Sequence, residues 1–217
     1  MATTYKMQLK NATDQSLYFI VFQRFPVYGL DSVAWKVCGL PAPANIEQPT
    51  VNSISWSMEY GIAIVNFQDE GSLYTPQKRV GGMLGNIYSV TSSDDVPNIS
   101  GVSVGTTSQD QIVLENKTGP ATKVNQGFTL SGDVIGAERC VGGGEMSIYK
   151  DYNRYYVACS SSHIVTGQVI DLPAPNPNIN IVIPAIEVKF PEGVYDCTVM
   201  AYIDDPDDYS LKVNYDS

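Results

Sequence analysis

Apolar and polar residues alternate along most of this chain. In TYKMQLKN (4–11), Tyr5, Met7 and Leu9 alternate with charged or amide side chains, which is the two-residue period of a strand with one buried face. The following run LYFIVF (17–22) is apolar throughout and predicts a strand buried on both faces. Because the turn residues NATDQS separate the two stretches, they favour an opening hairpin.

Further strands are predicted along the rest of the chain by short apolar or alternating runs. YDCTVMAYI and YSLKVNY flank residues 204–208 and predict a closing antiparallel hairpin. Trp35 and Trp56 alternate with aliphatic residues and are expected in the core. The other predicted strands are DSVAWKVC, SISWSMEYGIAIVNF, QIVLEN, GFTLSGDVIG, GEMSIYKD, RYYVACS, HIVTGQVIDL, NINIVI and IEVKF.

The pattern predicts an all-β fold with little or no helix, because no long window combines helical apolar spacing with capping residues. We expect an antiparallel β-sandwich, or two packed sheets with long loops, forming a single domain over residues 1–217. The polar, turn-rich stretch 91–127 is a weak internal boundary with short edge strands. No repeat of fixed period is visible, which disfavours a propeller or a solenoid.

Charge and hydropathy narrow the range of partners. The formal net charge of −10 opposes binding to nucleic acid or to an anionic membrane. No apolar run is long enough for a transmembrane segment or a signal peptide. The sequence therefore predicts a soluble cytoplasmic protein, with non-classical export as the alternative.

The four cysteines, at positions 38, 140, 159 and 197, are widely spaced and include no CxxC pair. In a reducing compartment we expect Cys38, Cys140, Cys159 and Cys197 to be buried thiols. One or two disulfides are the alternative.

Four aspartates surround a proline near the C-terminus, at positions 204, 205, 207 and 208. Carboxylates from acidic loops bind Ca²⁺ in some β-sandwiches, so Asp204, Asp205, Asp207 and Asp208 are a candidate metal site. The spacing lacks the Asp-x-Asp-x-Asp-Gly pattern, however, and the same residues favour a solvated turn. We therefore expect no cofactor, with Ca²⁺ as the alternative.

Catalytic patterns are weak. His163 is the only histidine, and the sequence has no Gly-x-Ser-x-Gly motif. Ser147 and Lys150 match Ser-x-x-Lys, but they lie in a predicted strand, which holds such residues apart. The glycines 142–144 lack the Lys-Ser/Thr of a phosphate-binding loop. We expect that the protein is not an enzyme, and we assign no catalytic residue.

Tyrosines are concentrated in YKDYNRYY (149–156). Aromatic faces beside amide and guanidinium groups suit a sugar or a protein surface. The predicted ligand-binding residues are Tyr149, Tyr152, Asn153, Arg154 and Tyr155. The leading hypothesis is a non-catalytic, lectin-like or surface-binding recognition protein, which uses loop tyrosines and acidic turns to bind protein or carbohydrate. The alternative is a self-associating structural subunit that forms homo-oligomers or filaments through strand edges.

Overall fold

The structure is a computed structural model that describes residues 3–26, 29–94, 96–104, 108–170, 179–205 and 208–215, excepting the side chains of 102–104. These residues form strands and no helix. The strands are β1 (Thr4–Ala12), β2 (Leu17–Phe22), β3 (Asp31–Ser32), β4 (Lys36–Leu40), β5 (Thr50–Ser57), β6 (Tyr60–Gln68), β7 (Leu73–Gly81), β8 (Asn86–Ser93), β9 (Val96–Val104), β10 (Gln111–Asn116), β11 (Val124–Leu130), β12 (Asp133–Val141), β13 (Met146–Lys150), β14 (Tyr155–Ser160), β15 (Ile181–Val188), β16 (Asp196–Asp205) and β17 (Asp208–Tyr215).

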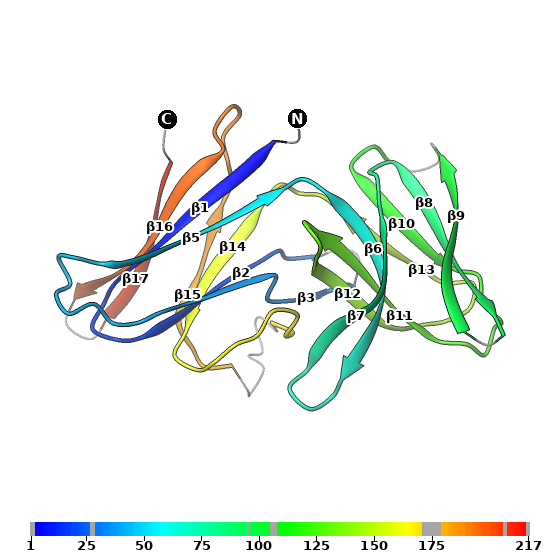
Figure 1. Cartoon of the computed structure of the whole chain (residues 1–217), viewed down its shortest axis with the longest axis horizontal. Coiled ribbons are helices and arrows are strands. Elements are labelled where there is room, and N and C mark those ends of the chain that lie inside the picture. The colour runs from blue at the N-terminus through cyan, green and yellow to red at the C-terminus, as the bar shows by residue number, and fades with distance from the viewer. Residues whose placement is uncertain are drawn as a thin grey trace.

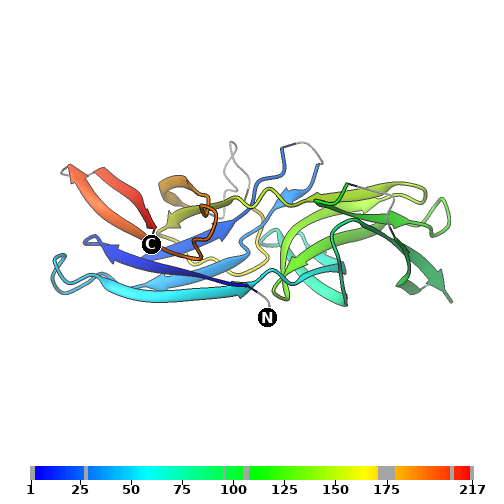
Figure 2. The same cartoon turned by 90° about the horizontal axis from the view of Figure 1, so that it is seen from above.

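The strands form four sheets, which are arranged in two lobes (Figure 1 and, from above, Figure 2). Sheet I has the order β17-β16-β1-β5 and sheet II the order β15-β14-β2-β4. These two sheets come from both ends of the chain, and we call them the end lobe. Sheet III (β3-β12-β11-β6-β7) and sheet IV (β13-β10-β8-β9) come from the middle of the chain, apart from the short β3. We call them the middle lobe.

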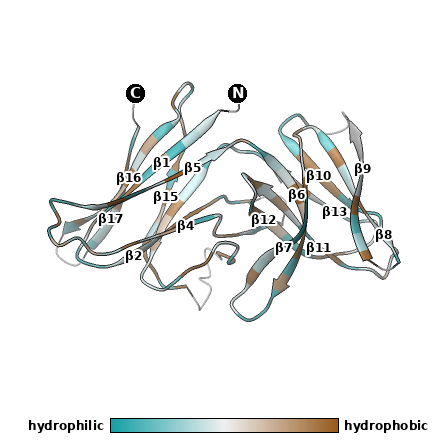
Figure 3. Cartoon of the chain, in the orientation of Figure 1, coloured by the Kyte–Doolittle hydropathy of each residue, from teal (hydrophilic) through white to brown (hydrophobic). Residues whose placement is uncertain are grey.

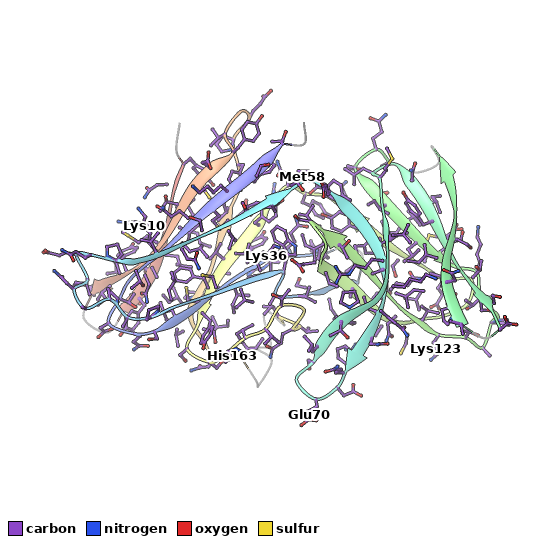
Figure 4. The ribbon with its side chains drawn as sticks, in the orientation of Figure 1. Lys10, Lys36, Met58, Glu70, Lys123 and His163 are labelled. Carbon is purple, nitrogen blue, oxygen red and sulfur yellow. The ribbon has the colours of Figure 1, made fainter. Side chains whose placement is uncertain are left out.

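The chain passes between the lobes at two main connections. One lies between β5 and β6, and the other between β13 and β14. Met58 lies in the first connection, where Figure 4 shows it between the lobes. Contacts also tie the lobes together, because the Trp35 indole donates a hydrogen bond to the Leu130 carbonyl at 2.9 Å, and Lys36 forms an ion pair with Asp133 at 2.5 Å.

The all-β fold and its antiparallel sandwich character are confirmed. The closing hairpin is confirmed as well, since β16 and β17 pair antiparallel from Cys197–Tyr215 to Asp205–Asp208. The predicted opening hairpin is wrong: β1 pairs with β5 and β16 in sheet I, whereas β2 pairs with β4 and β14 in sheet II. The turn after β1 therefore carries the chain from one sheet to the facing one. Two strand pairs, β1–β16 and β8–β10, are parallel.

The core follows the alternation along the strands, which Figure 3 shows as alternating hydropathy. In β2, Leu17, Phe19 and Val21 face the main core, whereas Ile20 and Phe22 belong to a second cluster on the other face. This strand is buried on both faces, as predicted. Trp35 and Trp56 are buried, which confirms their assignment to the core.

Residues 161–170 form a covering segment. The stretch HIVTGQVIDL was predicted as a strand, but its described part, 163–170, makes only isolated bridges at Gln168 and Val169. Ile164 and Ile170 pack on the outer face of sheet II, and Val169 packs on that of sheet III. The strand prediction is wrong here because burial under a covering loop produced the same apolar pattern.

The predicted boundary region, 91–127, runs from β8 through β9 and β10 into β11. It therefore lies inside the middle lobe, and β9 is an edge strand of sheet IV. The single-domain assignment stays a prediction. Within the described chain, no helix has the length and apolar character needed to cross a membrane.

Candidate functional site

The predicted tyrosine site divides between the core and the surface. Tyr149, in β13, and Tyr155, at the start of β14, have side chains that are 1% and 0% exposed. Tyr149 stacks on Phe128 with 5.6 Å between ring centroids, and Tyr155 stacks on Trp35 at 5.7 Å. These two rings therefore pack inside the lobes and offer no face to a ligand.

The remaining predicted residues lie on the connection between β13 and β14, residues 151–154. Asp151 accepts hydrogen bonds from the Tyr60 hydroxyl at 2.5 Å and from the Asn153 backbone N–H at 2.9 Å. Asn153 has a φ of 45°, and asparagine adopts this left-handed conformation more readily than most residues. The bend turns the chain so that Tyr152 and Arg154 both line one surface pocket.

This pocket has a volume of about 320 Å³ and is lined by Arg24, Pro26, Tyr152, Arg154 and Tyr156. We call it the Tyr–Arg pocket. Arg24 and Pro26 follow β2, and Tyr156 is the second residue of β14. Sheet II fixes the two sides relative to each other, because Phe22 is the register partner of Tyr156. The volume lies at the lower end of the range for small-molecule sites.

Two arginines bring positive charge to this pocket, beside the carboxylate of Glu187. The Arg24 guanidinium lies 4.4 Å from the centroid of the Tyr156 ring, a cation–π contact. None of the described carboxylates forms a salt bridge with Arg24, whereas Arg154 lies 3.8 Å from Glu187. Two exposed guanidinium groups thus stand together on a chain of net charge −10.

The hydroxyl of Tyr156 donates a hydrogen bond to Glu187 at 3.1 Å. Partial burial, and then the bond to the Glu187 carboxylate, raises the pKa of Tyr156. The side chain therefore remains neutral at physiological pH. Its ring holds Arg24, its hydroxyl is fixed by Glu187, and the residue has no feature of a general base.

The described aspartates of the predicted acidic turn lie at the end of β16 and at the start of β17. Asp204, Asp205 and Asp208 are exposed, and Asp205 is the register partner of Asp208. Asp207 lies outside the described residues. Within the part of the chain that is described, no group of three or more His, Cys, Asp and Glu side chains could hold a metal ion. The Ca²⁺ site stays a prediction.

The side chains considered for catalysis do not gather. His163 is exposed in the covering segment, 5.3 Å from the Tyr18 ring (Figure 4). Ser147 is buried in β13 and pairs with Leu114. The Lys150 ammonium forms a salt bridge with Asp110 at 3.1 Å.

All four cysteines lie in the described residues, and none forms a disulfide. Cys38, Cys159 and Cys197 are buried, as predicted, whereas Cys140 is exposed. Burial raises the pKa of the Cys159 thiol. This residue therefore stays protonated at neutral pH.

Sequence reasoning missed three residues of the pocket. Arg24, Pro26 and Tyr156 line it, but the first two are far from the tyrosine-rich stretch in the chain. The sequence did contain one signal for Arg24. It directly follows the strand that is buried on both faces, and its charged side chain has to extend from the core to the surface. Tyr156 was visible in YKDYNRYY, and strand alternation places it opposite the buried Tyr155.

The RhiA family model matches residues 2–213. The chain belongs to the RhiA family. The match covers strands from both lobes, including all residues of the Tyr–Arg pocket. No curated protein and no solved structure matches the chain.

Proposed function

We propose that this protein is a non-catalytic recognition protein that binds an acidic saccharide in the Tyr–Arg pocket. The observation that carries the proposal is the convergence of two guanidinium groups and two tyrosine side chains on one pocket of about 320 Å³. Guanidinium groups bind carboxylates through paired, charge-assisted hydrogen bonds. Tyr156 holds Arg24 against its ring, and Tyr152 adds an aromatic ring with a polar tip, which suits the face and hydroxyls of a sugar ring.

An anionic ligand fits the balance of charge better than a neutral one. Arg24 has no carboxylate partner among the described residues, and Arg154 is shared with Glu187 only at 3.8 Å. A carboxylate between the two arginines therefore gains strong hydrogen bonds at a site where the rest of the chain repels anions. Binding of an anion here would therefore depend on these two arginines, and not on the net charge of the protein.

Isothermal titration with a tri-mannuronate, and with neutral mannotriose as the matched ligand, tests the proposal. We expect the acidic trisaccharide to bind and the neutral one to bind at least tenfold more weakly, because one charged hydrogen bond contributes about 1.5–3 kcal/mol. Arg24→Met should reduce the affinity for tri-mannuronate by a similar factor. Equal affinity for the two sugars would contradict the proposal.

The control is Lys123→Met, which removes one positive charge from an exposed residue of the middle lobe (Figure 4). If bulk charge governed binding, both variants would weaken it equally. The alternative hypothesis of a structural subunit that self-associates through strand edges stays a prediction.

A further inference from the structure

The same small set of hydrogen bonds occurs in both lobes. In the end lobe, the backbone N–H and hydroxyl of Thr13 donate to the Asn11 side-chain oxygen at 3.1 and 2.8 Å. In the middle lobe, Thr118 makes the same two bonds to Asn116, at 3.0 and 2.6 Å. All four side chains are buried. Each Asn-x-Thr follows a similar strand, MQLKNAT in one case and IVLENKT in the other.

The amide nitrogens of these asparagines continue the correspondence. Asn11 Nδ2 donates to the carbonyl of Leu40, the last residue of β4. Asn116 Nδ2 donates to the carbonyl of Val141, the last residue of β12. Thus β1 corresponds to β10, and β4 corresponds to β12.

The strand pairing extends this correspondence to both lobes in full. β1 lies parallel to β16 and antiparallel to β5, and β10 lies parallel to β8 and antiparallel to β13. Each of the four other antiparallel pairs in the end lobe has a match in the middle lobe. β16–β17 matches β8–β9, β2–β4 matches β11–β12, β2–β14 matches β11–β6, and β14–β15 matches β6–β7. Only the short β3, at the edge of β12, has no counterpart among these described pairs.

Tyrosines at the two connections between the lobes also correspond. Tyr155 is the first residue of β14 and bonds to Trp56 in β5. Tyr60 is the first residue of β6 and bonds to Asp151, directly after β13. A second pocket, of about 270 Å³, lies at the Tyr60 connection and is lined partly by Glu59, Tyr60 and Arg79. It occupies the place in the middle lobe that the Tyr–Arg pocket occupies in the end lobe.

These correspondences divide the chain into four segments: segment 1 (4–57), segment 2 (60–104), segment 3 (111–150) and segment 4 (155–215). Segments 1 and 2 form a first repeat, which corresponds to a second repeat of segments 3 and 4. The end lobe, however, combines segments 1 and 4, and the middle lobe combines segments 2 and 3. The two repeats have therefore exchanged halves.

The length of the connections explains the exchange. Only residues 58–59 join segment 1 to segment 2, and only 151–154 join segment 3 to segment 4. Such short connections run directly from one lobe to the other and leave too little chain for segment 1 to fold back on segment 2. Short hinges favour exchange between copies for the same reason.

We propose that the chain is an internal duplication with exchanged halves, and that the same exchange joins it to a second copy of itself. Segment 1 of one chain then completes the end lobe with segment 4 of another. The strand ladders β1–β16 and β2–β14 form identically within one chain and between two. No disulfide locks the closed form. Concentration during folding therefore decides between the two forms.

The exchanged dimer contains a shared pocket. Arg24 and Pro26 come from segment 1 of one copy, whereas Tyr152, Arg154 and Tyr156 come from the other copy. This consequence rests on the proposed function, but the exchange itself does not. The two can therefore be tested separately.

Inter-chain disulfides test the exchange. Lys6 and Asp196 are exposed register partners in the β1–β16 ladder. One chain carries Lys6→Cys, a second carries Asp196→Cys, and both carry Cys140→Ser to remove the exposed native thiol. The chains are unfolded in urea, mixed at high concentration, refolded and oxidised. We expect a disulfide-linked dimer, seen by non-reducing electrophoresis and by light scattering after separation.

The control mixture pairs Lys6→Cys with Lys123→Cys, because Lys123 lies in the middle lobe away from β1. The expected cross-link yield of this mixture is several-fold lower. A mixture of Lys6→Cys and Asp196→Cys that yields only monomers, or no more dimer than the control, overturns the proposal.

Complementation tests the shared pocket. Arg24→Met and Arg154→Gln chains are refolded together. Each exchanged dimer that contains one chain of each kind has one end lobe with both native arginines and one with neither. We expect tri-mannuronate to bind to this mixed dimer with the wild-type affinity, and to either variant alone at least tenfold more weakly. Cross-linking with no binding by any form, wild type included, would reject the proposed function and retain the exchange. Cross-linking with binding by wild type alone would reject the shared pocket.

Discussion

The indole nitrogen of Trp56 donates a hydrogen bond to the hydroxyl of Tyr155 across 3.1 Å in the core of the end lobe. The two rings meet edge to face, with 5.0 Å between their centroids. Trp56 belongs to β5 and Tyr155 to β14, so one buried contact joins an early strand to a strand from the last third of the chain. It is one of the side-chain contacts that close the end lobe.

Tyr155→Phe should therefore destabilise the end lobe. The substitution leaves the buried Trp56 N–H without its partner, which costs about 1–3 kcal/mol. Urea unfolding followed by tryptophan fluorescence measures the loss. Tyr156→Phe is the control, because its hydroxyl contacts Glu187 near the surface and its removal should change stability by less than about 1 kcal/mol. Equal losses for the two variants would contradict this account.

The paired asparagines predict matched effects in the two lobes. Asn11→Ala and Asn116→Ala each remove a buried amide that holds the turn after a strand. Each should lower the free energy of unfolding by about 2–4 kcal/mol, since backbone groups lose their partners. Chemical denaturation measures both variants. Thr13→Ser and Thr118→Ser keep the hydroxyl and should retain most of the stability; a large loss at only one asparagine would argue against equivalent roles.

Stability should fall at alkaline pH. Burial, and then the neighbouring Asp151 carboxylate, raises the pKa of Tyr60 above its ordinary value of 10.0. The pKa values of Tyr149 and Tyr155 are also raised, mainly by burial. The native state thus holds these protons more tightly than the unfolded chain does. The contribution of these tyrosines to the free energy of unfolding is fully present below about pH 10 and is lost as the pH rises further.

Urea midpoints between pH 8 and pH 11 measure this decline. Tyr60→Phe removes one of the raised groups, so its stability should fall less steeply above pH 10 than that of the wild type. A wild-type midpoint that stays constant across the whole range would show that these tyrosines do not govern the alkaline limit.

Calcium should leave the protein unchanged if the acidic turn is only a solvated hairpin end. Asp204, Asp205 and Asp208 are exposed, and exposed carboxylates without further ligands bind Ca²⁺ weakly. A thermal melt with millimolar Ca²⁺ and one with EDTA should therefore have the same midpoint. A real site, at a Ca²⁺ concentration 100 times its Kd, would add about 2.7 kcal/mol to the free energy of unfolding and raise the melting midpoint by several degrees. Such a rise would establish the metal site that we do not expect.

Cutting the chain between its repeats should preserve the fold. Fragments 1–104 and 108–217, expressed together, contain every strand of both lobes. The break between β9 and β10 in the middle lobe then corresponds to the missing link between β17 and β1 in the end lobe. Co-purification as a one-to-one complex with the circular dichroism of the intact chain is the expected result. Fragments that remain separate or insoluble would contradict it.

The two-residue periodicity predicted strands correctly where one face of the strand is exposed to solvent. TYKMQLKN is the clearest example, because the buried Met7 and Leu9 alternate with partly exposed neighbours. The closing hairpin was predicted correctly too. QIVLEN is a strand as predicted, although three consecutive residues in it are buried. HIVTGQVIDL was wrongly predicted as a strand, because a loop that covers a sheet also buries apolar residues at short intervals. The pairing of β1 with β16 had no local signal, since the two strands lie at opposite ends of the chain.

The candidate site could be predicted only in part. Tyr152 and Arg154 were found because they lie together in the sequence, but Tyr149 and Tyr155 were included although alternation buries them. Arg24 reaches the pocket through the β2–β14 ladder, which no local pattern reveals. The proposed duplication leaves only a short trace in the sequence, MQLKNAT and IVLENKT. That resemblance is too brief to reveal a repeat without the matching hydrogen bonds of the structure.

The two lobes can complete their strand pairing at different times during synthesis. The middle lobe is continuous in the chain apart from β3, so its strands can assemble once residue 150 has left the ribosome. β1 must wait for β16, nearly the whole length of the chain later, which is on the order of ten seconds or more at ordinary rates of translation. During that interval the apolar residues of β1 and β2 have no partner strands from segment 4. Segment 1 is therefore open to chaperones, to aggregation and to neighbouring nascent chains until segment 4 has been made.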